Sequence, residues 1–278
     1  MRRTLVLFAA LALALALALP AAAITDGVPD DDGHPYVGLM VAQDEQGNPL
    51  WRCSGTLIAP KLFLTAGHCT EAPAAHVEIW FEPGPIDLDP AYPAAGDNRC
   101  SGIGGYPCTG DVGGTPETHP QYDPDAFWLH DLGVVVLDEE VTELGYGRLP
   151  ELDQLDRLKP RRSTRFTAVG YGLQKAFPDA AAWKDEATRI RMVAYPYLVQ
   201  INTGFTGDGS LVLSNNAYSG GTCFGDSGGP NFVGTSNVIG GVTSFGLNWT
   251  CGGTGGVYRV DRLDDLGWLH EAFGSLLG

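Results

Sequence analysis

Apolar residues along this chain fall into short runs separated by glycine, proline and polar residues. Residues 76–81 alternate in polarity, which is typical of a β-strand with one buried face. The run at 134–137 is uniformly apolar and suits a strand buried on both faces. The pattern predicts further strands at residues 37–41, 56–58, 166–172 and 238–245, and more strand-like stretches between 190 and 213.

Two regions after residue 23 depart from the strand pattern. Apolar residues recur at helical spacing near the end of the chain, at Leu263, Leu266, Leu269 and Phe273. This spacing predicts an amphipathic helix over 261–273 that packs its apolar side on the protein. Residues 82–118 are rich in proline, glycine and aspartate, so we expect a long insertion there without a core of its own.

The amino terminus has the pattern of an export signal. A basic start is followed by a 15-residue Leu/Ala run at 5–19, and Pro20 and three alanines then precede Ile24. A membrane-spanning helix needs about 20 apolar residues, so this run is short for one. We therefore interpret residues 1–23 as a signal peptide and expect a secreted protein, extracellular or periplasmic, without a membrane anchor after cleavage.

Composition favours an all-β protein. The chain has 38 glycines and 19 prolines, which suits many strands joined by turns. Within the expected mature chain, 24–278, we place two strand-rich halves at about 24–145 and 146–260. With 33 acidic and 17 basic residues, the net charge of −16 argues against a nucleic-acid or anionic-lipid partner. A monomer is the default expectation.

Three sequence blocks carry candidate chemistry. They are LTAGHC at residues 64–69, HDLGVVVL at 130–137 and GDSGGP at 225–230. The hydroxyl of Ser227 is a weak nucleophile until a base removes its proton, and His68 is the candidate base. Asp131, at the start of an apolar run, would hold that imidazole in the correct tautomer and stabilise its charge.

These blocks resemble the trypsin/chymotrypsin family of serine endopeptidases, and the chain is similar to a secreted bacterial-type member from Ile24 to about His270. The resemblance implies two packed six-stranded antiparallel β-barrels, a C-terminal α-helix, and an active site between the barrels. It further implies hydrolysis of peptide bonds through an acyl-enzyme, with polypeptides as substrates, a protein inhibitor as a candidate partner, and no cofactor or metal.

The resemblance assigns a role to each residue of the site. His68, Asp131 and Ser227 would be the catalytic triad, and the backbone N–H groups of Gly225 and Ser227 would form the oxyanion hole. Ser244 would hydrogen-bond the acid and line the substrate cleft. In this family the aspartate before the serine pairs with a new α-amino group, and here those groups would be Asp226 and Ile24.

The expected signal cleavage falls directly before Ile24, so signal peptidase itself would expose that amine.

The substrate pocket can also be placed by resemblance. Gly221 stands at the pocket floor, where trypsin-like specificity needs an aspartate, and Gly246 and Gly256 stand at the walls beside Ser244. An open, uncharged pocket would accept a large apolar side chain rather than Arg or Lys, unless another loop supplied an acid. Trp249 would narrow the entrance.

Six cysteines in an exported chain predict disulfides, and their number alone allows 15 connectivities. No Cys-x-x-Cys spacing supports a zinc site instead. The carboxylates of residues 82–118 lack EF-hand spacing, so the sequence leaves open whether a calcium ion binds there. The family resemblance selects the pairs Cys53–Cys69 and Cys223–Cys251 and leaves Cys100 to pair with Cys108.

The other histidines have weaker claims to the site. His130 adjoins Asp131, but neighbouring strand side chains point to opposite faces. His119 matches a structural stretch of the family. No motif supports a catalytic role for His34, His76 or His270.

Two rival functions remain open from sequence. Residues 225–229 also match the G-x-S-x-G elbow of α/β-hydrolase esterases, but there the acid and histidine follow the serine, and only His270 does so here. The other rival is a protease-like fold used for binding. Such proteins usually lose a triad member, whereas this chain retains all three.

Overall fold

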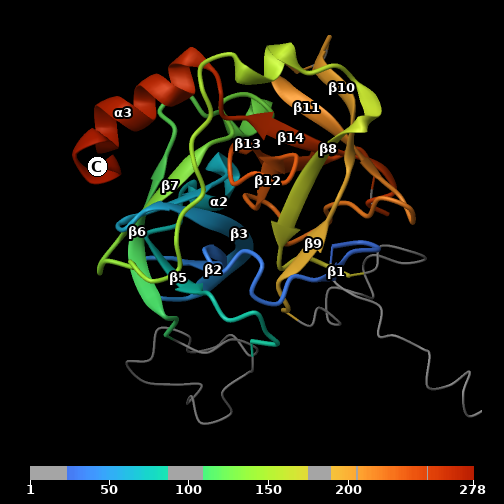
Figure 1. Cartoon of the computed structure of the whole chain (residues 1–278). Coiled ribbons are helices and arrows are strands. Elements are labelled where there is room, and N and C mark those ends of the chain that lie inside the picture. Colours follow the sequence, from blue (N-terminus) through green and yellow to red (C-terminus); the bar gives the residue numbers. More distant parts are fainter. Residues whose placement is uncertain (1–23, 87–108, 175–188, 205, 249) are drawn as a thin grey trace, which may run out of the picture.

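The computed structural model describes residues 24–86, 109–174, 189–204, 206–248 and 250–278. It consists of two antiparallel β-barrels side by side, with a C-terminal helix (Figure 1). The first barrel closes in the order β2 (Val37–Gln43), β3 (Pro49–Ala59), β4 (Leu62–Thr65), β7 (Gly133–Leu137), β6 (Val112–Thr118) and β5 (His76–Trp80).

The second barrel follows the same principle of closure. Its strand order is β8 (Arg161–Gly170), β10 (Tyr197–Thr203), β11 (Gly207–Asn215), β14 (Gly253–Arg259), β13 (Ile239–Gly246) and β12 (Pro230–Val233). Pairing of β12 with β8 closes the ring. The end of β8 also pairs with β9 (Met192–Ala194), and β9 pairs with β1 (Val28–Pro29). The first strand of the chain therefore joins the second barrel.

Three short helices complete the described elements before the C-terminal one. The α-helix α2 (Gly67–Thr70) follows β4, and the 3-10 helices η1 (Pro124–Ala126) and η2 (Gln154–Arg157) lie in connections. Among the described residues, no helix is both long and apolar enough to cross a membrane. The fold class expected from the family resemblance is confirmed, and it excludes the alternating β/α pattern of an α/β-hydrolase.

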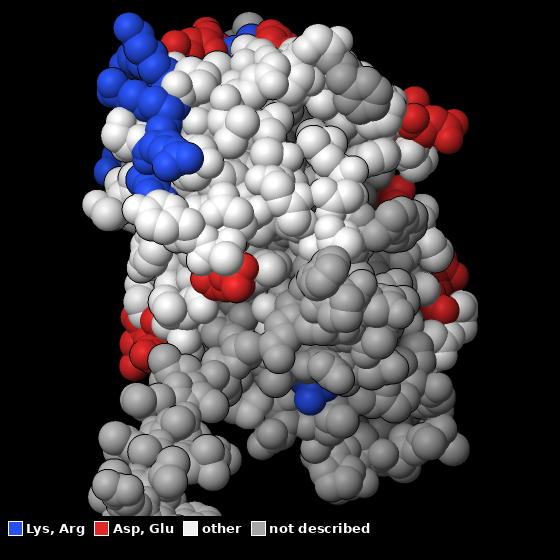
Figure 2. Space-filling model, turned by 90° about the vertical axis from the view of Figure 1, so that its right-hand side faces the viewer, with Lys and Arg blue, Asp and Glu red and all other residues white. Residues whose placement is uncertain are grey.

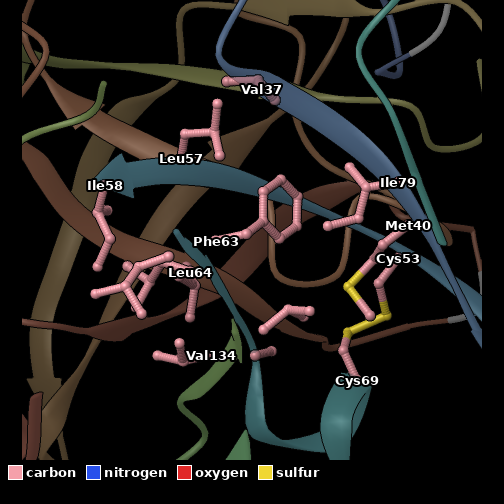
Figure 3. Close-up of a cluster of buried hydrophobic side chains, with 14 of the residues drawn as sticks. Val37, Met40, Cys53, Leu57, Ile58, Phe63, Leu64, Cys69, Ile79 and Val134 are labelled. Atoms are coloured by element: carbon pink, nitrogen blue, oxygen red, sulfur yellow. A yellow bond between two sulfur atoms is a disulfide. The ribbon is translucent and has the colours of Figure 1, made fainter. Parts of the chain in front are cut away.

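The core of the first barrel is built from the inward faces of its strands. Figure 3 shows Phe63 among Val37, Leu57 and Ile79, with a disulfide at the edge of the cluster. Each of these four side chains is fully buried. Burial of one such side chain contributes about 1.5–3 kcal/mol, so this cluster is a main source of stability.

The C-terminal helix α3 (Leu263–Leu277) extends beyond the expected residue 273. Leu269 and Phe273 pack into a buried cluster that contains residues of both barrels, but Leu263 is 71% exposed. Trp268 packs against the same cluster, and its ring centroid lies 4.9 Å from that of His119. The helix that ends the second half of the chain therefore packs back onto the first barrel (Figure 1).

The expectation of an insertion running to residue 118 is wrong at its end, because residues 112–118 form β6. The strand pattern was hidden by Gly113, Gly114 and Pro116. A Cβ at Gly114 would lie 2.7 Å from Val135 Cγ1 and from the Val136 carbonyl oxygen, so glycine is needed for close packing of the strands. Residues 87–108, with Cys100 and Cys108, lie outside the described part of the chain.

The charge of the described surface is uneven. Figure 2 shows Lys and Arg side chains gathered at one edge of the face that carries β8. Four basic residues occur close together at the start of that strand: Lys159, Arg161, Arg162 and Arg165. The acidic excess of the whole chain therefore does not describe every part of its surface.

Candidate active site

His68 lies in α2, directly after β4, and its position is fixed from two sides. The neighbouring Cys69 forms a disulfide with Cys53 of β3, with an S–S distance of 1.99 Å. The backbone N–H of His68 donates to Asp131 Oδ1 at 2.9 Å. Its ring nitrogen Nδ1 lies 3.1 Å and 3.0 Å from the two carboxylate oxygens of the same aspartate. A carboxylate accepts at this nitrogen, so Nδ1 carries the proton and Nε2 keeps its lone pair.

Asp131 is fully buried at the start of β7. Besides His68, it accepts a hydrogen bond from the hydroxyl of Ser244 at 2.5 Å. Burial of His68 opposes its protonation, but the charge of Asp131 and the hydrogen bond to it outweigh that effect and raise the pKa of His68. The arrangement therefore stabilises the imidazolium that a general base becomes.

His130 bonds elsewhere, although not for the reason expected, because neither His130 nor Asp131 lies in a strand. Its backbone has a φ of +52°, and its Nδ1 lies 3.1 Å from Asp264 of α3. Its ring stacks on that of His119 with centroids 5.1 Å apart. The two adjacent residues, His130 and Asp131, thus serve different parts of the structure.

Ser227 lies in a tight turn before β12. Gly225 and Gly228 have φ values of +93° and +76°, a region that favours glycine. The N–H of Asp226 donates to the carbonyl of Cys223. Within the part of the chain that the structure describes, the N–H groups of Gly225 and Ser227 have no acceptor. These are the two donors that the resemblance assigns to an oxyanion hole.

Ser54 of β3 joins the serine turn to the first barrel. Its backbone N–H donates to the Ser227 carbonyl at 2.7 Å, and its hydroxyl donates to the Gly225 carbonyl at 2.9 Å. The same hydroxyl accepts from the N–H of Tyr171 at 3.0 Å. The two carbonyls are held on the first-barrel side, which fixes the orientation of the peptide groups around Ser227.

A cavity of about 410 Å³ opens beside Ser227. Ser244 lines the same cavity, so the hydroxyl that binds Asp131 also forms its wall. The described residues that line it are all uncharged: Thr222, Cys223, Phe224, Ser227, Thr243, Ser244, Phe245, Gly246, Leu247, Asn248 and Cys251. Cys223 and Cys251 form the second disulfide, with an S–S distance of 2.09 Å, so both described disulfide expectations are confirmed.

Of the four expected pocket residues, Ser244 and Gly246 line this cavity. Gly221 and Gly256 are not among the described residues that line it. A Cβ at Gly256 would meet the ring of Phe245, and a Cβ at Gly221 would meet the side chain of Asn215. The space beside both glycines is therefore already filled. Trp249 lies outside the described residues.

Sequence reasoning missed six residues of the cavity: Thr222, Phe224, Thr243, Phe245, Leu247 and Asn248. Phe224 and Leu247 are 39% and 62% exposed, and Thr222 is less exposed than either. Phe224 and Thr222 lie within the segment that leads to the GDSGGP block, so their place in the chain was a usable signal. Leu247 follows β13 and had no such signal.

Asp226 is fully buried, and its carboxylate accepts from the N–H groups of Gly172 at 2.7 Å and Cys223 at 2.8 Å. Burial raises the pKa of Asp226 to about 7, against the effect of these hydrogen bonds and of the charge of Arg52. The side chain of Ile24 is also buried, in a small apolar cluster of the second barrel.

Among the described residues, two groups of side chains come close enough to suggest a metal site, and neither fits one. Cys53 and Cys69 beside His68 are joined in a disulfide and supply no thiolate. The other group is His119, His130 and Asp265.

In that second group, Nδ1 of His119 accepts from the N–H of Gln121 at 3.2 Å, so the proton lies on the Nε2 that faces Asp265. Burial and the charge of His130 lower the pKa of His119 to about 4, which keeps the ring neutral. The rings of His119 and His130 are stacked at 8° and do not aim their lone pairs at one point.

The sequence profile of the Trypsin family matches residues 110–265, more than half of the chain, so the chain belongs to this family. It is 27% identical over 258 residues to CLIP domain-containing serine protease B10 of Anopheles gambiae, covering 86% of this chain and 66% of that protein. This chain therefore spans just under two thirds of the Anopheles protein.

Two further relatives are of similar length. Trypsin of Saccharopolyspora erythraea is 28% identical over 234 residues, covering 84% of this chain and 91% of that protein. The solved structure of HL collagenase superposes with a TM-score of 0.64 at 21% identity, covering 90% of this chain and 99% of that one. At that identity the structural likeness supports the fold alone. At the level of the family, the chain is a trypsin-like serine protease domain.

Proposed function

We propose that this chain is a secreted serine endopeptidase of bacterial type that cleaves polypeptides through an acyl-enzyme on Ser227. The observation that carries the proposal is the position of Asp131. One buried carboxylate is bonded both to His68 and to Ser244, and Ser244 lines the cavity that Ser227 also lines. The acid, the base and the substrate cavity are therefore connected through direct contacts.

The proposed mechanism is that of the family's catalytic triad. Nε2 of His68 takes the proton of the Ser227 hydroxyl as the oxygen attacks the substrate carbonyl carbon. The carbonyl oxygen becomes negative and accepts from the N–H groups of Gly225 and Ser227, one such donor contributing about 3–4 kcal/mol. The peptide C–N bond then breaks, and His68 gives its proton to the leaving amine.

Deacylation repeats these steps with water. His68 takes a proton from the water as it attacks the ester, and returns that proton to Ser227 when the C–O bond breaks. Asp131 stays ionised throughout and stabilises the imidazolium in each half-reaction. No cofactor is needed for either step.

The pocket supports cleavage after large apolar residues rather than after Arg or Lys. The described lining is uncharged, and Phe224 and Leu247 place exposed apolar surface at the cavity. A substrate cation would have to give up its hydration here without a carboxylate partner. An apolar side chain would gain by burial against the same surface.

Activation would follow from export. Removal of residues 1–23 would create an amine at Ile24, and the buried carboxylate of Asp226 would be its partner. Support comes from Thr25, which already pairs with Gly221, and from the buried Ile24 side chain. The intact mass of the exported enzyme tests this step. A fully active chain that begins at another residue would contradict it.

The proposed activity is tested with matched peptides that differ only at the residue before the cut: Phe, Leu, Ala, Arg, Lys and Glu. We expect cleavage after Phe and Leu that is abolished by Ser227→Ala. Cleavage after Arg or Lys would keep the protease but contradict the pocket preference. No cleavage by protein with a verified Ile24 terminus would favour a binding protein that only resembles a protease.

A further inference from the structure

The family resemblance places a single residue, Gly221, at the floor of the substrate pocket, but the structure does not leave that space open. A Cβ built on Gly221 would lie 2.6 Å from the Cβ of Asn215 and still closer to its Cγ and Oδ1. Real Cβ atoms essentially never approach another atom closer than 3.0 Å. The volume that a residue 221 side chain would use is therefore taken by Asn215.

Backbone conformation does not explain the glycine. The neighbouring Gly220 has a φ of +62°, which favours glycine, whereas Gly221 is not among the described residues with positive φ. Other residues could adopt the backbone of Gly221 if the space beside it were empty. Asn215 thus accounts for the absence of a side chain at the position where a tryptic enzyme needs its aspartate.

Asn215 is held firmly in this place. It is the last residue of β11, pairs with Gly253 of β14, and is only 1% exposed. Its side-chain Nδ2 donates to the carbonyl of Thr222 at 2.7 Å, and Thr222 lines the cavity beside Ser227. The amide therefore packs directly behind the pocket wall, on the side of Gly221.

We propose that Asn215 closes the bottom of the substrate pocket and is the residue that sets the size of the side chain that the pocket accepts. This inference rests on the proposed function and deepens it. The missing side chain at Gly221 then does not deepen the pocket, because Asn215 fills the space beside it. Asn215 backs the lining residue Thr222, so the depth of the cavity is determined from β11 rather than from the loop before Ser227.

The polar end of Asn215 supports a role other than stability. Its Oδ1 is buried and has no hydrogen-bond partner in the described structure. A buried carbonyl without a donor is destabilising, and such groups are rare in folded proteins. Positions that break a local rule of packing or hydrogen bonding are expected at functional sites.

The test compares Asn215→Gly with Asn215→Leu. Leucine has the same number of side-chain heavy atoms as asparagine, branched at the same position, but loses the bond to Thr222, so it is the control that keeps the space filled. Rates of cleavage are measured with peptides that carry Ala, Leu, Phe or Trp before the cut. We expect Asn215→Gly to raise kcat/KM for Trp relative to Leu by about tenfold, and Asn215→Leu to keep the order of the native enzyme.

A second variant tests the contact with Gly221 itself. Gly221→Ala should lower the melting temperature or kcat/KM in the native background, because the new Cβ would clash sterically with the side chain of Asn215. The same change should be nearly harmless in the Asn215→Gly background. Equal effects of Gly221→Ala in both backgrounds would overturn the proposal, as would the same substrate profile for Asn215→Gly and Asn215→Leu.

A burst of nitrophenol from 4-nitrophenyl acetate tests the proposed activity separately from the role of Asn215, because hydrolysis of this small ester does not depend on the pocket. A burst in every variant with an unchanged peptide profile would overturn the role of Asn215 alone. No burst from the native enzyme, with Ser227→Ala as reference, would overturn the proposed function instead.

Discussion

Ser244 donates a 2.5 Å hydrogen bond from its hydroxyl to Oδ2 of Asp131. Ser244 belongs to β13 of the second barrel, whereas Asp131 stands before β7 of the first. The bond therefore crosses between the barrels and links the wall of the cavity beside Ser227 to the carboxylate that bonds His68. In the proposed mechanism, the pocket wall and the base are therefore coupled through Asp131.

Loss of this bond should lower activity more than stability. A hydrogen bond to a charged group contributes about 1.5–3 kcal/mol, so Ser244→Ala should reduce kcat/KM by about ten- to a hundredfold. Peptide hydrolysis measures the effect. Ser236→Ala is the control, because that exposed serine bonds only within its own turn. Equal activity of both variants would contradict the role of Ser244.

The pH dependence of kcat/KM should report His68. A general base works only when neutral, so activity falls as the pH drops through its pKa. Because the pKa of His68 is raised, the acid limb should lie above the ordinary histidine value of about 6.5. Asp131→Asn should move that limb to lower pH. It should also reduce kcat by about 10⁴-fold, the magnitude given by the reference triad of this same family.

The buried Asp226 makes a prediction about the chain with residues 1–23 attached. Its pKa is raised from 3.8 to about 7, so the folded state binds a proton that the unfolded state releases between these values. Stability should therefore fall as the pH rises from about 4 to 7, by a few kcal/mol in order of magnitude.

Thermal unfolding across this pH range measures the effect of Asp226. The Asp226→Asn variant should show a flatter curve, and the chain that starts at Ile24 should also be flatter if the new amine neutralises the carboxylate. If the full chain, Asp226→Asn and the chain that starts at Ile24 all show the same dependence of stability on pH, the Asp226 carboxylate is not the cause of that dependence.

A buried ion pair joins the segment before β2 to the segment before β9. Arg191 and Asp30 are both buried, with Nε 3.0 Å from Oδ2, and the guanidinium also donates to the Phe81 carbonyl at 2.8 Å. Arg191→Leu should destabilise the fold by about 3–5 kcal/mol, because it removes the guanidinium from a buried carboxylate that then keeps only His34 as a partner among the described residues. Adding Asp30→Leu should restore part of that loss. Urea unfolding of both variants measures it, and a further loss in the double variant would contradict this assignment.

Much of the site could be predicted from the sequence because its chemistry is local. The blocks around His68, Asp131 and Ser227 each contain the glycine or cysteine that shapes the local backbone. Residues that are neighbours in the sequence therefore also determine the local geometry of the site. The disulfides Cys53–Cys69 and Cys223–Cys251 came from the family resemblance, and the structure confirms both.

The remaining features depend on contacts between distant segments. Strand β6 was missed because Gly113 and Gly114 carry no side chain to show the alternation, and their need for close approach is visible only beside β5 and β7. The expected open floor at Gly221 likewise ignored Asn215, which belongs to a different strand. Leu263 fits the helical period but lies on the solvent side of α3. Sequence pattern alone does not say which neighbour will fill a space.

The most direct test of the central claim is to trap the acyl-enzyme. The enzyme is mixed with 4-nitrophenyl acetate, quenched in acid during the burst and digested, and the modified peptide is identified by mass spectrometry. The account predicts one acetyl group on Ser227, absent from Ser227→Ala and strongly reduced in His68→Ala. An acetyl group on another residue, or full hydrolysis by Ser227→Ala, would contradict it.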